Sequence, residues 1–239
     1  MPRVLTPELM DKPDAPREEL DQSLRFIRRV NVALGGVSAV TRHFNRWSKR
    51  WPKDRPITIL DLGTGSADIP VALHSWGTAR GFDIRTTGID VHPTTLALAR
   101  EYVRAAKGED AITLLELDAR TAFHRFGVAS FDYVHAGMFL HHFSDVEVMT
   151  LVRIMDRIAR RGIIWNDLVR SPIAAAGIRV LTARATPIVR HDARVSVTNG
   201  FTKREVLDVA RRLDLKYCGY AASLLTQRFT LAGEKHGGH

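Results

Sequence analysis

Short apolar runs alternate with amphipathic stretches through the middle of the chain. The predicted strands lie at about 57–62, 84–90, 112–117, 131–136 and 163–168. The stretches at about 67–80, from Pro93 and at 146–159 have the three- and four-residue apolar spacing of helices. Strands that alternate with helices predict a parallel sheet with helices on both faces, which is an α/β fold.

Two further amphipathic segments precede the first strand. The first begins near Glu18 and is ended by Gly35-Gly36, and the second covers Val37 to Trp51. Residues 1–16 are rich in proline and charge, which predicts a loose arm. The sequence therefore divides into an arm with lid helices at 1–52 and a main domain at 53–239.

The segment 169–200 interrupts the alternation after the fifth strand. Ser171-Pro172 predicts the start of a helix, and Pro187 is expected to end one. A connection of this length is usually functional, so we expect a lid or substrate insert. Thr202 and Glu205 then form a capping box that begins another helix.

The last part of the chain predicts the edge of the sheet. Segments at about 217–221 and 226–231 are expected to form two antiparallel strands there. The tail at 234–239 is expected to be disordered.

Composition restricts the location and the partners of the protein. The formal net charge of +9 is spread along the chain, which favours solubility over binding to a polyanion such as RNA. The single cysteine, Cys218, cannot form an internal disulfide, and the first twenty residues lack the apolar core of a secretory signal. No run approaches the roughly 20 apolar residues of a membrane span. We therefore expect a cytoplasmic protein.

The most informative segment joins the first strand to the next helix. It reads Asp61-Leu-Gly63-Thr64-Gly65-Ser-Ala-Asp68. Its glycines allow the backbone to approach a ligand closely. Asp68 stands where a dinucleotide-binding loop needs its third glycine, and with Asp61 it would repel a pyrophosphate and attract a cationic ligand. Asp90 ends the second strand, where a carboxylate can accept from both ribose hydroxyls.

These motifs, in this order, resemble those of the class I S-adenosylmethionine-dependent methyltransferases. The order continues with Leu117-Asp118-Ala119 after the third strand and Phe131-Asp-Tyr-Val at the fourth. The resemblance covers about residues 57–168. It implies a Rossmann-like seven-stranded sheet whose last strand is antiparallel, with an N-terminal helical appendage, and S-adenosylmethionine as the cofactor.

The resemblance also implies a set of cofactor-binding residues. These are Asp61, Gly63, Thr64, Gly65, Asp90, Val91, Asp118, Ala119, Ala136, Gly137 and Met138. Among them, Asp61 would hold the amino group of the cofactor, Asp90 its ribose and Asp118 its adenine amino group. For each aspartate the alternative is a helix cap or a surface charge.

Catalytic residues leave a weaker mark, because methyl transfer from a sulfonium mainly requires alignment. The catalytic candidates, at the carboxyl ends of the fourth and fifth strands, are His141, His142 and Asp167. Either histidine could act as a base or serve packing, whereas Asp167 could orient a substrate hydroxyl or pair with Arg170. The substrate or lid candidates are Arg28, Asn31, Arg170, Arg190 and His191. No histidine spacing predicts a metal site.

The leading functional hypothesis is methyl transfer to oxygen or carbon of a small aromatic or polyketide-like molecule. An RNA methyltransferase is the alternative, but the segment after the fourth strand lacks the Asn/Asp-Pro-Pro-Tyr type of motif used on base amino groups. No RNA-binding module is recognisable. Asp68 argues against a nicotinamide-dependent oxidoreductase. The sequence leaves a homodimer open.

Overall fold

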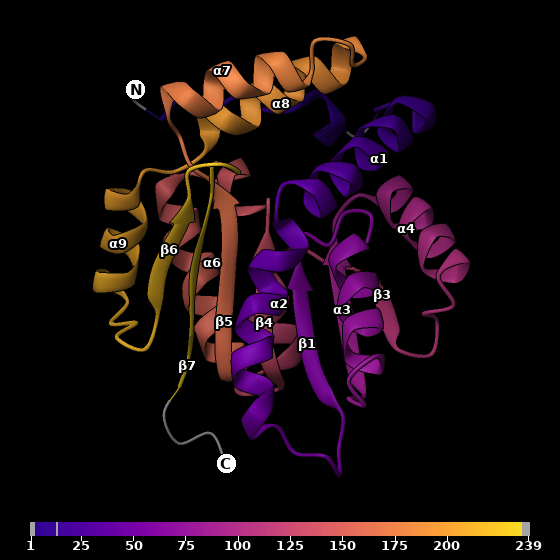
Figure 1. The fold of residues 1–239 in the computed structure, drawn as a ribbon, viewed down its shortest axis with the longest axis vertical. Coiled ribbons are helices and arrows are strands. Elements are labelled where there is room, and N and C mark those ends of the chain that lie inside the picture. The colour runs from indigo at the N-terminus through magenta and orange to yellow at the C-terminus, as the bar shows by residue number, and fades with distance from the viewer. Residues whose placement is uncertain (1–2, 13, 236–239) are drawn as a thin grey trace.

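A seven-stranded sheet forms the centre of the computed structural model, which describes residues 3–12 and 14–235 (Figure 1). The strands are β1 (Ile57–Leu62), β2 (Ile84–Asp90), β3 (Ile112–Glu116), β4 (Phe131–Gly137), β5 (Ala159–Leu168), β6 (Gly219–Ser223) and β7 (Arg228–Glu234). Their order is β3-β2-β1-β4-β5-β7-β6. The first five strands are parallel, whereas β7 runs antiparallel to both β5 and β6. The predicted fold class is confirmed.

Helices cover both faces of the sheet and its carboxyl edge (Figure 1). The α-helices are α1 (Arg17–Ala33), α2 (Gly36–Trp47), α3 (Asp68–Thr78), α4 (Pro93–Ala105), α5 (Ala122–Phe126), α6 (Asp145–Ile158), α7 (Pro172–Leu181), α8 (Pro187–Asn199) and α9 (Lys203–Arg212). The 3-10 helices are η1 (Leu9–Asp11), η2 (Ser48–Arg50), η3 (Ala119–Thr121) and η4 (Leu140–His142). Helices α7, α8 and α1 lie across the ends of the strands, where they cover the predicted ligand site. Among the described residues, no helix is both long and apolar enough to cross a membrane.

The alternation of side chains along each strand builds one hydrophobic core on each face. Leu60 and Leu62 of β1 pack toward α6, whereas Ile59 packs toward α2 and α3. On the second face Phe44 contacts Trp47, Trp51, Trp76 and Tyr133 in an aromatic cluster, with ring centroids 5.1–6.0 Å apart. By the same alternation, the side chain of Asp61 belongs to the α2–α3 face at the carboxyl end of β1.

Several predicted helix starts are confirmed. Pro93 is the first residue of α4, and the capping box of Thr202 and Glu205 begins α9. A second capping box, between Ser144 and Glu147, begins α6. These contacts satisfy backbone N–H groups that have no partner within the helix.

Other element boundaries differ from the predictions. Pro187 begins α8 and does not end a helix, because proline fits a first helical turn where its missing N–H costs nothing. The helix predicted to reach Trp51 ends at Trp47, and β5 begins at Ala159. Glu234 ends β7, and residues 236–239 of the predicted disordered tail lie outside the described residues.

The prediction of a loose N-terminal arm is wrong for residues 3–12. Arg3 donates to the backbone oxygens of Asn199 (2.8 Å) and Phe143 (2.6 Å). The carboxylate of Asp192 on α8 accepts from two successive backbone N–H groups of η1, at 2.8 and 3.0 Å. Charged groups that suggested solvent exposure therefore anchor the arm against α8 and η4 over the carboxyl edge of the sheet.

Candidate active site

A cavity of about 560 Å³ lies at the carboxyl ends of β1, β2 and β4. The loop after β1, helices α1 and α8, and the arm form its walls. Its apolar lining includes Leu24, Ile27, Val30, Leu34, Ile69, Phe139, Phe143, Leu168, Ile178, Leu181 and Val189. The cavity adjoins the β1–β4 switch point of the strand order, where open α/β sheets bind ligands. Its volume is typical of small-molecule sites.

The glycine loop forms the floor of this cavity. Gly63 and Gly65 have φ angles of +63° and +52°, which favour glycine, and both line the cavity with Thr64. A Cβ atom on Gly63 would lie 2.0 Å from the ring of Phe139. The close approach of backbone and ring therefore requires glycine at this position.

Asp61 belongs to a buried polar cluster beside the loop. Its carboxylate accepts from the Thr64 hydroxyl at 2.7 Å and lies 2.6 Å from Nδ1 of His135 on β4. Nε2 of His135 has no hydrogen-bond partner among the described residues, and His135 lines the cavity. Sequence reasoning missed this histidine, whose only signal is a polar residue inside a buried strand.

Asp90 is held at the end of β2 by two backbone groups. It accepts from the amide of Gly65 at 3.0 Å and from that of His92 at 3.0 Å. Burial raises the pKa of Asp90 above its usual value, while these two hydrogen bonds oppose the rise. The carboxylate is thereby oriented at the rim of the glycine loop, where it lines the cavity.

The other predicted cofactor residues divide into two groups. Val91, Gly137 and Met138 line the cavity, whereas Asp118, Ala119 and Ala136 are not among the lining residues. Asp118 caps η3 and is held by Arg120 at 2.6 Å. Ala136 belongs to the core on the α6 face, because alternation along β4 turns it away from the α2–α3 face.

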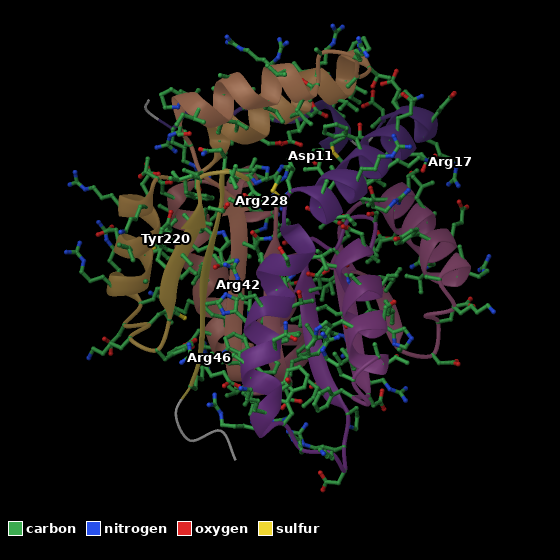
Figure 2. All side chains as sticks on the ribbon, in the orientation of Figure 1. Asp11, Arg17, Arg42, Arg46, Tyr220 and Arg228 are labelled. Atoms are coloured by element: carbon green, nitrogen blue, oxygen red, sulfur yellow. The ribbon has the colours of Figure 1, made fainter. Side chains whose placement is uncertain are left out.

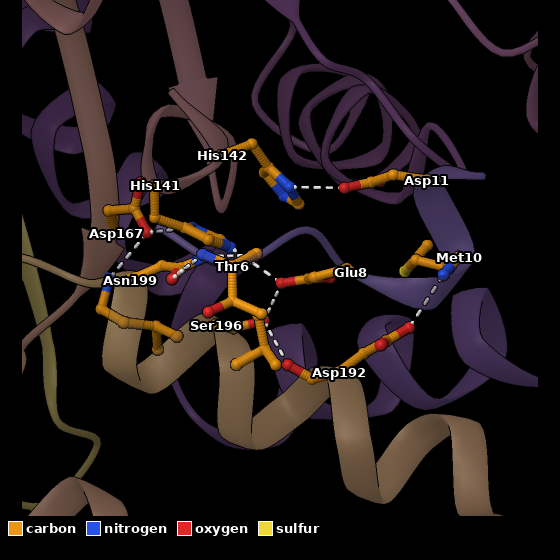
Figure 3. Close-up of polar contacts among 12 residues, drawn as sticks. Thr6, Glu8, Met10, Asp11, His141, His142, Asp167, Asp192, Ser196 and Asn199 are labelled. Carbon is orange, nitrogen blue, oxygen red and sulfur yellow. Dashed lines mark hydrogen bonds and ion pairs between the residues drawn. The ribbon is translucent and has the colours of Figure 1, made fainter. Parts of the chain in front are cut away.

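His141 lies between two carboxylates (Figure 3). Its Nδ1 is 2.7 Å from Oδ1 of Asp167, and its Nε2 is 3.4 Å from Oε1 of Glu8. All three side chains are buried, and Asp167 also accepts from the Leu168 amide at 2.9 Å. The arm therefore places Glu8 beside the pair of His141 on η4 and Asp167 on β5.

The charges of this cluster set its protonation. Burial lowers the pKa of His141, but Asp167 and Glu8 outweigh burial and raise it to about 10. Burial raises the pKa of Asp167, but the charge and hydrogen bond of His141, with hydrogen bonds from Leu168 and Trp165, together outweigh burial and lower it. At neutral pH the cluster therefore holds an imidazolium between carboxylates.

His142 pairs with the arm in a similar way. Its Nδ1 is 2.8 Å from Oδ2 of Asp11, and its ring stacks on His141 with centroids 4.3 Å apart (Figure 3). Burial lowers the pKa of His142, but Glu8 and Asp11 outweigh it and raise that pKa. Both histidines therefore bind the arm through its carboxylates.

The same cluster is the one candidate metal site among residues 3–12 and 14–235. Ligand atoms of Glu8, His141 and His142 all lie within 4.8 Å of one another. The Nδ1 atoms face Asp167 and Asp11, as in metal sites where a carboxylate orients each histidine. The sequence did not indicate this group, since Glu8 is 133 residues from His141.

The raised pKa of His141 predicts a pH dependence of stability. The stabilising charge of His141 is fully present below its ordinary pKa of 6.5 and is lost as the pH rises toward about 10. We therefore expect the melting temperature of the wild type to exceed that of His141→Gln most at pH 6 and least at pH 10. Thermal unfolding of both proteins across this range measures the difference, and a gap that widens with pH would contradict the assignment.

Of the five predicted lid residues, only Asn31 lines the cavity, where its Nδ2 donates to Asp68 at 2.8 Å. The Arg28 guanidinium lies 4.6 Å from the Tyr102 ring centroid. Arg170 is buried and donates to Glu205 at 2.6 Å. The remaining two, Arg190 and His191, are on α8 but outside the lining.

Residues 59–162 match the model of a family described as a methyltransferase domain. The fold is similar to a putative O-methyltransferase of Nostoc punctiforme PCC 73102, with 16% identity and a TM-score of 0.66 over 97% of this chain and 64% of that one. An O-methyltransferase family protein of Burkholderia thailandensis gives 15% identity and a TM-score of 0.63, over 93% and 60%. This chain thus spans less than two thirds of either structure.

A third solved structure is a magnesium protoporphyrin IX methyltransferase of Synechocystis PCC 6803 with bound S-adenosylhomocysteine. It has 13% identity and a TM-score of 0.57, over 84% of this chain and 82% of that one. No curated protein matches the sequence.

The sheet order, the glycine loop at the switch point and these comparisons define a Rossmann-like methyltransferase fold. The match of residues 59–162 to a methyltransferase domain agrees with the resemblance of the motifs. The enzyme class expected from the sequence, a methyltransferase, agrees with this match.

Proposed function

We propose that the protein transfers a methyl group from S-adenosylmethionine to an oxygen or carbon of a small aromatic or polyketide-like molecule. The observation that carries this proposal is the position of the Asp167–His141 pair. Asp167 holds His141 at the wall of the apolar cavity whose floor is the glycine loop. A proton acceptor, a cofactor loop and an apolar substrate space therefore share one cavity.

The residues present fit the cofactor. S-adenosylmethionine supplies an activated methyl group on a positively charged sulfur. Gly63 and Gly65 leave the backbone accessible, and Asp90 offers an oriented carboxylate for ribose hydroxyls. Asp61 and Asp68 add negative charge beside the loop, which favours a cationic ligand over a pyrophosphate.

The protonation state of His141 depends on whether Glu8 of the N-terminal arm contacts its Nε2. While Glu8 faces Nε2, His141 is protonated and cannot accept a proton. A substrate hydroxyl that replaces Glu8 removes one of the two carboxylates that raise the pKa. The Nε2 proton leaves with Glu8 as a carboxylic acid, so neutral His141 then accepts the proton of the hydroxyl or enol, and Asp167 stabilises the imidazolium that forms. The arm and the insert at 169–200 would exclude water during transfer.

The walls of the cavity favour a small molecule over RNA, because the arm, α1 and α8 all contribute to them. The division into 1–52 and 53–239, a cytoplasmic location and the absence of a nucleic-acid partner stay predictions, and a homodimer stays open.

Transfer of labelled methyl groups tests the proposal. Incubation with S-adenosylmethionine labelled on the methyl carbon and a panel of phenols and 1,3-dicarbonyl compounds should yield labelled small molecules. A short transfer RNA transcript serves as the competing acceptor. Label incorporated into RNA and into none of the small molecules would contradict the proposal.

Proton transfer by His141 needs no metal, so chelation should not reduce activity. We expect the rate of methyl transfer to change less than twofold after dialysis against EDTA. Loss of activity that a divalent cation restores would instead assign Glu8, His141 and His142 to a metal site.

A further inference from the structure

The terminal nitrogens of a buried arginine at the start of β7 have no partner in the described part of the chain. Arg228 is 4% exposed, and neither Nη1 nor Nη2 has a hydrogen-bond partner among the described residues. Burial lowers its pKa to about 10, so the guanidinium stays charged at neutral pH. A buried charge without a partner is costly, and an anionic ligand would satisfy it.

Arg228 belongs to the wall of the same cavity. Figure 2 shows it near the carboxyl edge of the sheet, below α7 and α8. Ser23 and Asn31 of α1 also line the cavity, and within residues 3–12 and 14–235 neither Oγ of Ser23 nor Oδ1 of Asn31 has a hydrogen-bond partner. A Cβ atom on Gly36 would lie 2.6 Å from Oδ1 of Asn31 and 3.0 Å from Nη1 of Arg228. Glycine at this position therefore leaves room for both polar groups.

The two carboxylates whose charges act on Arg228 have other hydrogen-bond partners. Asp68 accepts from Asn31 at 2.8 Å and from Ser66 at 3.1 Å, whereas Asp167 faces His141 at 2.7 Å. Both carboxylates act on Arg228 through their charge alone. Their negative charge disfavours a dianion such as phosphate, and one guanidinium matches one monoanion.

We propose that Arg228, beside Asn31, forms a carboxylate-binding subsite of the cavity. The planar guanidinium can donate two parallel hydrogen bonds to a single carboxylate. This inference rests on the proposed function and deepens it. The carboxylate belongs either to the amino-acid end of the cofactor or to an acidic substrate, and binding measurements separate these sources.

The test compares the affinities of wild type and Arg228→Gln for pairs of probes that differ in a carboxylate. The first pair is S-adenosylhomocysteine and 5′-methylthioadenosine, which lacks the amino-acid end. The second is 4-hydroxybenzoate and its methyl ester, both added with saturating S-adenosylhomocysteine. Calorimetry should show that Arg228→Gln weakens the acid member of one pair by about 10- to 100-fold, because a hydrogen bond to a charged group is lost. The other member should change less than twofold.

The pair that responds identifies the source of the carboxylate. Arg170→Gln is the matched control, since Arg170 is also buried but lies outside the cavity lining, and it should leave both affinity ratios unchanged. Arg228→Lys, which keeps the charge and loses the planar fork, serves if the glutamine variant does not fold, and we expect an intermediate loss.

If Arg228→Gln leaves the affinity ratios of both pairs unchanged from those of the wild type, the subsite is overturned. None of these readouts needs turnover, so failure of the proposed methyl transfer would be seen separately.

Discussion

Asp90→Ala should weaken the binding of S-adenosylhomocysteine by about 100-fold or more. The carboxylate is fixed by the amides of Gly65 and His92, which leaves it oriented at the cavity for the ribose hydroxyls. Each hydrogen bond to a charged group contributes about 1.5–3 kcal/mol, and 1.4 kcal/mol corresponds to tenfold in affinity. The substitution also removes the acceptor for two amides that shape the loop.

His191→Ala is the control for this prediction. His191 is partly exposed on α8 and lies outside the cavity lining, so its removal should change the affinity less than twofold. Asp90→Asn keeps one acceptor oxygen and should fall between the two. Calorimetric titration measures all three, and equal affinities of wild type and Asp90→Ala would refute the ribose assignment.

His141→Ala should lower kcat by about 10²- to 10⁴-fold, the range expected for loss of a positioned proton acceptor. Asp167→Asn should lower kcat as well. It removes the carboxylate whose Oδ1 lies 2.7 Å from Nδ1 of His141, where it orients the ring and stabilises the imidazolium. Both variants should bind S-adenosylhomocysteine as the wild type does, since neither residue holds the glycine loop. Steady-state kinetics with the acceptor found in the labelling assay give kcat.

A histidine outside the cavity separates catalysis from general effects of substitution. His124 on α5 is exposed, and His124→Ala should leave kcat unchanged. If His141→Ala retained kcat within twofold, His141 would serve only to hold the arm through Glu8. A lowered melting temperature without a change in kcat would then be the expected result.

The sheet was predictable because its signals are local. The predicted strand from Ile84 to Asp90 has the same ends as β2 in the structure, and Pro93 begins the next helix as predicted. Errors occurred where the deciding contacts are distant in sequence. Arg3 and Glu8 read as solvent-exposed charges, but their partners lie 133 or more residues away on η4, α6 and α8.

The site was predicted in part for the same reason. Strand ends located Asp90 and Asp167, since the carboxyl ends of parallel strands share one edge. His135 and Arg228 were missed, because the sequence does not show whether a polar residue within a predicted strand faces a ligand site. Arg170, in contrast, follows a strand end but turns toward Glu205 of α9.

Thermal stability with S-adenosylmethionine, S-adenosylhomocysteine, NADH and buffer tests the central claim most directly. A ligand at 100 times its dissociation constant should stabilise the fold by about 2.7 kcal/mol, which raises the melting temperature measurably. We predict a rise with both adenosyl compounds and none with NADH. A rise with NADH alone would contradict the account and would assign the glycine loop to a nicotinamide cofactor.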